Sequence, residues 1–246
     1  MKVIFNADDF GLTPGVNAGI ARAHRQGVVK STTMMVGMAA EADALALAAE
    51  LPELKIGLHL RFTAGAPLTG HPSLTSDGHH CLTYADFWRK QDFDPLVVYQ
   101  ECHAQVEYFL RLGLPLSHID SHHHVHRHPQ LFDVVKEVAS EFRVPMREVG
   151  LVGAAAPLRY HFSDRFYDHG VSMDALTTHL HAMRADCDVL EVMCHPAEVD
   201  HWLAQNSGYT HQREQELQLL TSAQLMDWLV QHDIRVTDYS ELGSAS

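Results

Sequence analysis

The sequence has little of several features that would define a protein class by themselves. Its four cysteines, Cys81, Cys102, Cys187 and Cys194, form no CxxC pair and no spacing typical of a disulfide framework, so we expect a reducing compartment. No apolar run reaches the roughly 18 residues that a membrane span requires. The amino-terminal apolar segment turns polar at Asn6, which is too early for the core of a signal peptide. Together these features predict a soluble, cytoplasmic protein.

Basic residues are also scarce. The chain has 18 Lys and Arg against 31 Asp and Glu, a formal net charge of −13. Nucleic acids and anionic membranes both require a basic surface, so neither is expected as a partner. No GxSxG motif is present and no Cys/His pair can be placed, which argues against covalent catalysis. No glycine-rich phosphate fingerprint follows the first apolar segment. A neutral or cationic small ligand fits this composition best.

Short apolar segments alternate regularly with segments of helical periodicity. With 246 residues, 46% of them hydrophobic, the chain can bury one large core, and we expect residues 1–246 to form a single domain. Strands are predicted over Lys2–Phe5, Val28–Met38, Lys55–Leu60, Leu116–Asp120, Val144–Val149, Asp188–His195 and Arg235–Tyr239. Helices are predicted over Pro14–His24, Glu41–Leu51, Pro95–Leu112, Pro129–Phe142, Asp174–Arg184, Gln212–Leu220 and Ser222–His232. This alternation predicts a parallel α/β fold, a closed or nearly closed barrel of about seven or eight strands.

Two segments interrupt the alternation. Arg61–Asp94 is punctuated by glycine and proline and contains several aromatic residues, so we interpret it as an excursion over the active-site face. Aromatic residues there could stack on sugar rings, although packing of the excursion onto its own barrel explains them equally well. Gly150–Asp174 has little periodicity and is expected to be irregular.

The stretch His118–Pro129 contains six histidines and one aspartate within twelve residues. It follows an apolar strand, so Asp120 and His122 are expected at a strand end, where α/β proteins carry their chemistry. Imidazole and carboxylate together suit a divalent metal ion. A solvated tract that binds metal adventitiously is the alternative, but this stretch is interior and precedes an amphipathic segment. We expect one or two of its histidines to be ligands, with the roles of the others open.

Other strand ends carry similar groups. Asp8 and Asp9 follow the first strand, and neighbouring residues of an extended chain point to opposite faces, so the two carboxylates can take different tasks. A pair of aspartates that caps the next helix is the alternative interpretation. His59 ends the third strand and His195 ends a late one. A lone histidine at a strand end is more often a hydrogen-bonded core residue, but parallel strands bring such ends together.

Four motifs resemble a known family in their order and spacing. They are Asn6–Gly11, Gly57–Leu60, Asp120–His126 and Glu191–Pro196. The sequence resembles the YdjC-like carbohydrate deacetylases along nearly its whole length, and within them the bacterial chitooligosaccharide deacetylases.

The resemblance implies a distorted TIM-barrel-like (β/α) barrel and a metal-dependent hydrolase. Such an enzyme removes N-acetyl groups from N-acetylglucosamine units of short chitooligosaccharides such as chitobiose and chitotriose. By position in the motifs, Asp9, His59 and His122 would bind one divalent metal ion, Asp8 would be the general base and His195 the acid. The resemblance favours Mg²⁺, whereas two imidazole ligands suit Zn²⁺ as the alternative.

Other functions stay open from the residues alone. A metal-dependent phosphoesterase also uses Asp and His clusters at barrel mouths, although few basic residues lie near the motifs to hold a phosphate. A non-catalytic metal-binding or sugar-binding protein is the third hypothesis. Arg147 follows a predicted strand and could support the base or an oxyanion. The sequence leaves the oligomeric state open, with a homodimer as one possibility.

Overall fold

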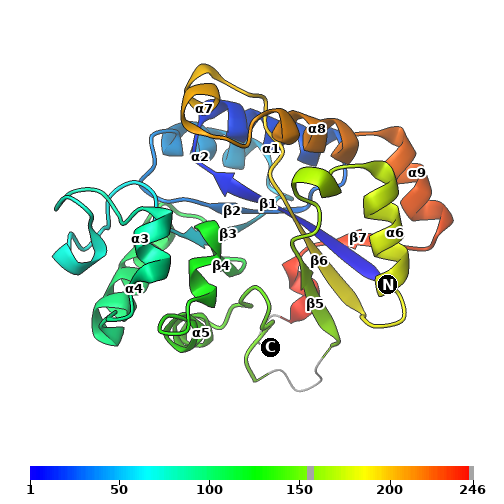
Figure 1. Ribbon diagram of the computed structural model, residues 1–246. Helices are drawn as coiled ribbons and strands as arrows, with labels where there is room; N and C mark the ends of the chain where they lie inside the picture. Colours follow the sequence, from blue (N-terminus) through cyan, green and yellow to red (C-terminus); the bar gives the residue numbers. More distant parts are fainter. Residues whose placement is uncertain (154–157, 244–246) are drawn as a thin grey trace.

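A curled, parallel sheet forms the centre of the molecule (Figure 1). This computed structural model describes residues 1–153 and 158–243. The described strands are β1 (Lys2–Phe10), β2 (Ser31–Met34), β3 (Lys55–Leu60), β4 (Ile119–Ser121), β5 (Tyr160–Ser163), β6 (Val189–Cys194) and β7 (Arg235–Thr237). They pair in the order β4-β3-β2-β1-β6-β5, and β7 also pairs with β1. All these pairings are parallel, so the carboxyl ends of the strands lie at one edge of the sheet.

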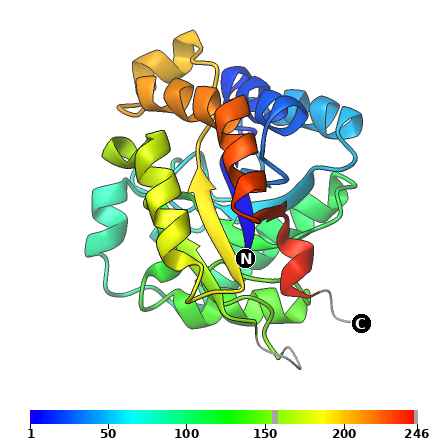
Figure 2. The same ribbon diagram turned by 90° about the vertical axis from the view of Figure 1, so that its right-hand side faces the viewer.

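Helices surround the outside of this sheet, as two perpendicular views show (Figure 1 and Figure 2). They are α1 (Pro14–Gln26), α2 (Glu41–Glu50), α3 (Tyr84–Arg89), α4 (Pro95–Arg111), α5 (Phe132–Glu141), α6 (Met173–Met183), α7 (His201–Asn206), α8 (His211–Leu220) and α9 (Ala223–Gln231). Several of them start with a side-chain cap: the Thr13 side chain accepts a hydrogen bond from the Val16 backbone N–H and Ser222 accepts one from the Leu225 backbone N–H. None of the described helices has the length and apolar character needed to cross a membrane.

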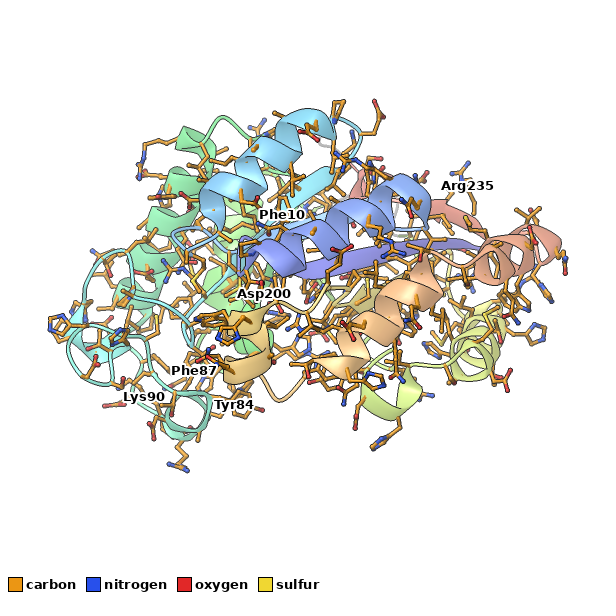
Figure 3. All side chains as sticks on the ribbon, turned by 90° about the horizontal axis from the view of Figure 1, so that it is seen from above. Phe10, Tyr84, Phe87, Lys90, Asp200 and Arg235 are labelled. Carbon is orange, nitrogen blue, oxygen red and sulfur yellow. The ribbon has the colours of Figure 1, made fainter. Side chains whose placement is uncertain are left out.

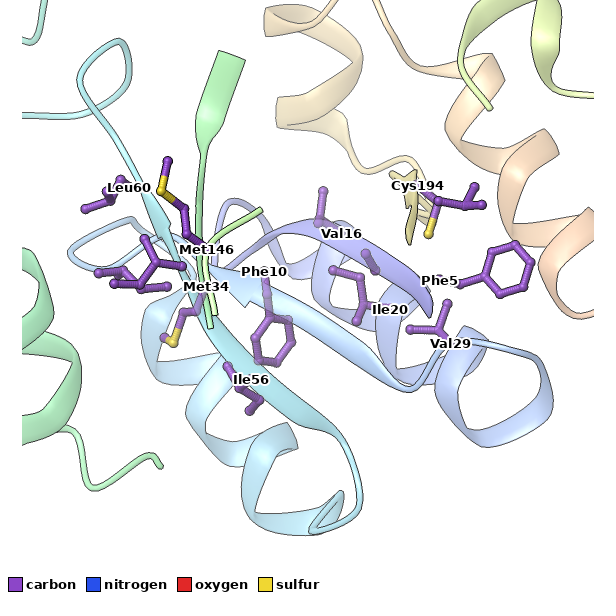
Figure 4. Close-up of a cluster of buried hydrophobic side chains, with 14 of the residues drawn as sticks. Phe5, Phe10, Val16, Ile20, Val29, Met34, Ile56, Leu60, Met146 and Cys194 are labelled. Atoms are coloured by element: carbon purple, nitrogen blue, oxygen red, sulfur yellow. The ribbon is translucent and has the colours of Figure 1, made fainter. Parts of the chain in front are cut away.

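Strand β1 is the centre of the core because it pairs with three other strands. Val3 to Phe10 are all buried. Apolar side chains of β1, α1 and the neighbouring strands pack together there, among them Phe5, Phe10, Val16 and Ile20 (Figure 4). One continuous hydrophobic cluster therefore joins the sheet to its helices.

The predicted α/β barrel-like fold is confirmed, but the ring is not closed. β4 and β5 are the two ends of the described sheet path and do not pair with each other, so the sheet is a half-barrel. The predicted strand Val144–Val149 is wrong. Only Met146 makes isolated bridges there, to Ile119 and to Gly150. Pro145 has no N–H to donate, and the positive φ values of Glu148 (69°) and Gly150 (74°) turn the chain away.

Three further boundaries differ from the prediction. The first strand extends to Phe10, so Asp8 and Asp9 belong to the end of β1 and not to a loop after it. The predicted strand Val28–Met38 shortens to Ser31–Met34. The supposedly irregular segment Gly150–Asp174 contains β5, while its residues 154–157 lie outside the described part of the chain. Most residues of β5 are partly or fully exposed, and its sequence shows no clear alternation of apolar and polar residues. The sequence pattern therefore did not reveal this strand.

Gly57 in β3 leaves room for the buried His118. The His118 ring donates a hydrogen bond from Nε2 to Asn6 Oδ1 (3.0 Å) and stacks on Tyr239 with ring centres 3.5 Å apart. A Cβ atom at Gly57 would lie 2.6 Å from the His118 ring and from its backbone oxygen. Gly57 is therefore required by packing in a motif that otherwise belongs to the site.

Gly57→Ala should lower the free energy of unfolding by about 1–3 kcal/mol, because the added methyl group overpacks a rigid core. The measurement is the midpoint and slope of urea denaturation for the wild type and the variant. Gly208→Ala is the matched control, since no atom lies within 4 Å of a Cβ built there. Equal midpoints for the two variants would contradict this account of β3.

Candidate metal centre and active site

The predicted site residues meet at the carboxyl edge of the sheet. Asp8 and Asp9 end β1, His59 lies in β3, His122 directly follows β4, and His195 directly follows β6. The pairing of β1 with β2 shifts register between Ala7 and Phe10, and Asp9 has φ 74°. This irregularity breaks the simple alternation of faces and gives the two neighbouring carboxylates different surroundings.

Asp9, His59 and His122 form a compact group of possible metal ligands. One ligand atom from each lies within 4.8 Å of the others. Asp9 Oδ1 is 2.9 Å from His122 Nδ1 and 3.5 Å from His59 Nε2. Asp9 and His59 are buried, and the His122 side chain is 15% exposed. The three residues named from the sequence as metal ligands are thus brought together, with one carboxylate oxygen facing two imidazoles.

Asp120 fixes the orientation of His59. The His59 ring donates from Nδ1 to Asp120 Oδ1 at 2.7 Å, and Thr33 Oγ1 donates to Asp120 Oδ2 at 3.0 Å. Burial by itself lowers the pKa of His59, but the Asp120 and Asp8 carboxylates outweigh it and raise this pKa to about 10. With Nδ1 bonded to Asp120, Nε2 is the nitrogen left facing Asp9. A carboxylate behind a ligating histidine is the usual way to fix its tautomer.

Asp8 is held separately, by Arg147. Its two oxygens accept hydrogen bonds from the guanidinium at 2.8 and 2.7 Å, and Asn6 Nδ2 donates to Oδ1 at 2.9 Å. Burial raises the pKa of Asp8, but the charge and hydrogen bonds of Arg147 overcome it and hold this pKa well below its usual range. Arg147 also contacts Asp120 (2.9 Å) and Glu191 (2.7 Å). Asp8 is therefore ionised and has a fixed orientation.

A second group of possible ligands, Asp8, His59 and Asp120, also lies within 4.8 Å. Its donor atoms are already engaged, because Arg147 binds Asp8 and Asp120 and the His59 Nδ1 atom is bonded to Asp120. A cation there would have to displace a buried guanidinium. In the group around Asp9, His59 Nε2 and His122 Nδ1 face only Asp9 Oδ1 among the described residues, and that oxygen is itself a member of the group, so this group is the better metal site.

Arg213 of α8 reaches the same cluster and was not anticipated from the sequence. It donates to Asp9 Oδ2 at 2.7 Å and, through Nε, to the Tyr209 carbonyl at 3.1 Å. Burial raises the pKa of Asp9, while Arg213 and His122 together lower it well below the usual value. The guanidinium occupies one carboxylate oxygen and leaves Oδ1 for the histidines.

His195 lies on the other side of the cluster, against a stacked pair of tyrosines. Its ring centre is 5.7 Å from that of Tyr167 and 5.9 Å from that of Tyr209. Within the described part of the chain, its buried Nδ1 has no hydrogen-bond partner. Burial, and then the charge of Arg213, lower the pKa of His195 to about 4. The ring is therefore neutral near pH 7 and has a free nitrogen.

Glu216 of α8 supports this histidine. It accepts a hydrogen bond from the His195 backbone N–H and another from Tyr209 Oη, at 2.6 Å. Burial raises the pKa of Glu216 to about 8. No sequence pattern marks this residue, because it stands in an ordinary polar helix.

The remaining histidines of the His118–Pro129 stretch have different surroundings. His123 and His124 adopt left-handed backbone angles (φ 55° and 53°) directly after His122. The His123 ring contacts that of His122 (3.9 Å between centres), whereas His126 bonds to Ser121. His128 packs among aromatic rings, including Phe87 at 5.5 Å. None of these four belongs to either ligand group found among the described residues.

The fold and this cluster define a class: a parallel α/β half-barrel with an Asp/His cluster at the carboxyl edge of its sheet. The chain belongs to the YdjC-like protein family, whose model matches residues 2–231.

Relatives match over the full length. A carbohydrate deacetylase of Vibrio cholerae is 59% identical over 246 residues, covering 100% of this chain and 98% of that protein. A carbohydrate deacetylase of Brevibacillus brevis is 41% identical, covering 99% of this chain and 100% of its own. A crystal structure from Enterococcus faecalis V583, described as a candidate cellobiose-phosphate cleavage protein, superimposes with a TM-score of 0.89 at 30% identity over 98% of both chains.

If Asp9, His59 and His122 bind the metal, His59→Ala and His122→Ala should each weaken metal binding more than Asp120→Asn does, because in the described structure Asp120 contacts the metal site only through the His59 ring. Asp120→Asn should weaken binding by about 10- to 100-fold, because it only releases the His59 ring. Isothermal titration of metal-depleted protein with Zn²⁺ and with Mg²⁺ measures all three. His169→Ala is the matched control, since its side chain is 97% exposed. Unchanged affinity in both ligand variants would exclude this group.

Proposed function

We propose that the protein is a metal-dependent carbohydrate deacetylase. Its substrates would be short chitooligosaccharides such as chitobiose and chitotriose, from which it removes N-acetyl groups of N-acetylglucosamine units and releases acetate. One observation carries this proposal: three kinds of group meet at the carboxyl edge of the sheet. They are the possible metal ligands Asp9, His59 and His122, the separately held carboxylate of Asp8, and the neutral ring of His195. The full-length match to proteins named carbohydrate deacetylases supports it.

The ligand group fits one divalent ion. One carboxylate and two imidazoles supply three donors, and a catalytic site of three protein ligands leaves positions for water and substrate. Bound there, such an ion lowers the pKa of a water molecule and polarises the acetyl carbonyl. Mg²⁺ is the first ion to test because of the resemblance of the motifs, and the two imidazoles make Zn²⁺ the alternative.

Asp8 is our candidate general base. Arg147 binds both of its oxygens, so the carboxylate cannot rotate. Oδ1 accepts from Arg147 and from Asn6, whereas Oδ2, among the described residues, accepts only from Arg147 and keeps a further lone pair for a proton. Arg147 also keeps Asp8 ionised, since it lowers the pKa of that carboxyl. Arg147 therefore positions the base and has no free charge for an oxyanion. Of the two roles left open for Arg147, these contacts support the one beside the base.

His195 is our candidate acid. Its Nδ1 atom has no hydrogen-bond partner in the described structure. The stacked rings of Tyr167 and Tyr209 pack against the His195 ring. The pKa of about 4 means that a proton reaching this ring is readily given up again. Nδ1 would receive the proton that Asp8 removes from the water and pass it to the departing sugar amine, which returns both groups to their starting protonation states.

The excursion Arg61–Asp94 would cover part of the active-site face. Glu101 of α4 holds it in place by accepting hydrogen bonds from the backbone N–H groups of Leu68 and Thr69, both at 2.9 Å. Arg61 is buried and donates to the Val36 carbonyl. The first part of the excursion is therefore fixed to the strands and helices beside the site. The acidic net charge of the chain suits a neutral substrate that yields a cationic amine.

Phosphoester cleavage is the second candidate, because the Enterococcus faecalis neighbour is described in terms of a sugar phosphate. The two arginines of the cluster argue against it. Arg147 is bound by three carboxylates and Arg213 by Asp9. A phosphate group would have to compete with these buried ion pairs.

The proposal is tested by incubating metal-depleted enzyme with N,N′-diacetylchitobiose after adding back Mg²⁺ or Zn²⁺. We expect stoichiometric release of acetate that depends on the added ion. Parallel assays follow phosphate release from cellobiose phosphate and acetate release from acetyl-lysine peptides. Phosphate release without acetate release would establish the second candidate. Metal binding without any turnover would indicate a binding protein.

Asp8→Asn should keep metal binding and lose about 10²-fold or more in turnover, because the amide cannot accept the water proton. The two readouts are metal stoichiometry and the initial rate of acetate release. Loss of the ion, with the rate restored by excess metal, would instead make Asp8 a ligand.

A further inference from the structure

We propose that Tyr84 and Tyr167 form two sugar-binding platforms beside the metal cluster, which make the enzyme act more efficiently on chitotriose than on chitobiose. This inference rests on the proposed function and adds where the substrate lies. The ring that loses its acetyl group would lie over the cluster, with one neighbouring ring against each tyrosine.

The two tyrosines reach the cluster from different strands. Asp8 and Asp9 end β1, in the middle of the path β4-β3-β2-β1-β6-β5. Tyr84 belongs to the excursion that follows β3, and it contacts a residue that follows β4. Tyr167 follows β5 and contacts the histidine after β6. The two side chains therefore contact different parts of the cluster, Tyr84 through His123 and Tyr167 through His195.

Tyr84 is 56% exposed although it is a large aromatic residue. Its ring centre is 5.2 Å from that of His123, which in turn lies 3.9 Å from the candidate ligand His122. Thr63 hydrogen-bonds to His123 Nδ1 at 2.9 Å and fixes that ring. A row of rings thus leads from the buried cluster to an exposed tyrosine.

The helix that carries Tyr84 is firmly anchored. Phe87, one turn later, is fully buried and contacts Phe93 with ring centres 5.0 Å apart. Figure 3 shows Tyr84 and Phe87 together on α3 at the outer side of the molecule. The exposure of Tyr84 is therefore built into an ordered helix.

Tyr167 is 44% exposed and is supported from behind. It stacks on Tyr209 with ring centres 4.2 Å apart and planes within 5°, and Tyr209 is bonded to the buried Glu216. Its ring also contacts the candidate acid His195 at 5.7 Å. One face of Tyr167 is thus covered by Tyr209, while the exposed part of the ring lies beside the group that would meet the departing amine.

The chemistry of these surfaces fits sugar rings. A pyranose presents a face of C–H groups that packs on an aromatic ring, while its hydroxyl groups remain available to polar neighbours. Thr63 and the histidines beside each tyrosine supply such neighbours. Exposed aromatic surface next to a catalytic cluster is typical of a ligand-binding site.

The experiment compares kcat/KM for acetate release from N-acetylglucosamine, diacetylchitobiose and triacetylchitotriose. Tyr84→Ala and Tyr167→Ala should each lower the value for the trisaccharide by about tenfold, with the double variant lower still, because each removes one stacking partner. The loss should shrink as the substrate shortens. Tyr84→Phe and Tyr167→Phe should retain most of the activity, since the ring remains. Tyr99→Ala is the control, because its hydroxyl bonds Glu141 on an outer helix.

Binding of triacetylchitotriose to the Asp8→Asn protein, with and without each tyrosine change, gives a readout apart from turnover and should weaken in parallel. If the wild type releases acetate but losses are equal for all three lengths, or absent, the two platforms are disproved. If the wild type releases no acetate from any of them, the proposed function fails, and the binding measurement still decides whether the tyrosines hold sugar.

Discussion

The buried guanidinium of Arg147 is the interaction on which the site depends. Asp8, Asp120 and Glu191 all direct carboxylate oxygens at it, and all are buried. Without this cation, three negative charges would face one another out of contact with water. Breaking such a buried pair costs on the order of 3–5 kcal/mol. The guanidinium fixes the orientation of the candidate base Asp8 directly. Through Asp120 it also fixes the orientation of His59, which faces the metal position.

Two arginines from distant segments give two neighbouring aspartates different tasks. Arg147 occupies both oxygens of Asp8, whereas Arg213 occupies only one oxygen of Asp9 and leaves the other to His59 and His122. The irregular end of β1 makes this separation possible. The difference between a candidate base and a candidate ligand thus arises from the cations around two identical side chains.

Much of this arrangement could be predicted, because strand-end chemistry in a parallel sheet depends on local sequence. His59 and Asp9 end apolar strands, and parallel pairing brings those ends together. Arg213 and Glu216 could not be found in this way, since they stand in a helix with no unusual pattern. The prediction of a strand over Val144–Val149 was wrong because Pro145, among its apolar residues, has no N–H to donate to a neighbouring strand. β5 was missed because it lies at an end of the sheet with half-exposed residues, which leaves no clear period.

The central claim is that one divalent ion binds between Asp9, His59 and His122. Crystals grown with Zn²⁺ and measured at the zinc absorption edge test it most directly. The account predicts one anomalous peak per chain, about 2.0–2.2 Å from a carboxylate oxygen of Asp9 and from one ring nitrogen of each histidine. A peak between Asp8 and Asp120, with Arg147 displaced, would contradict it.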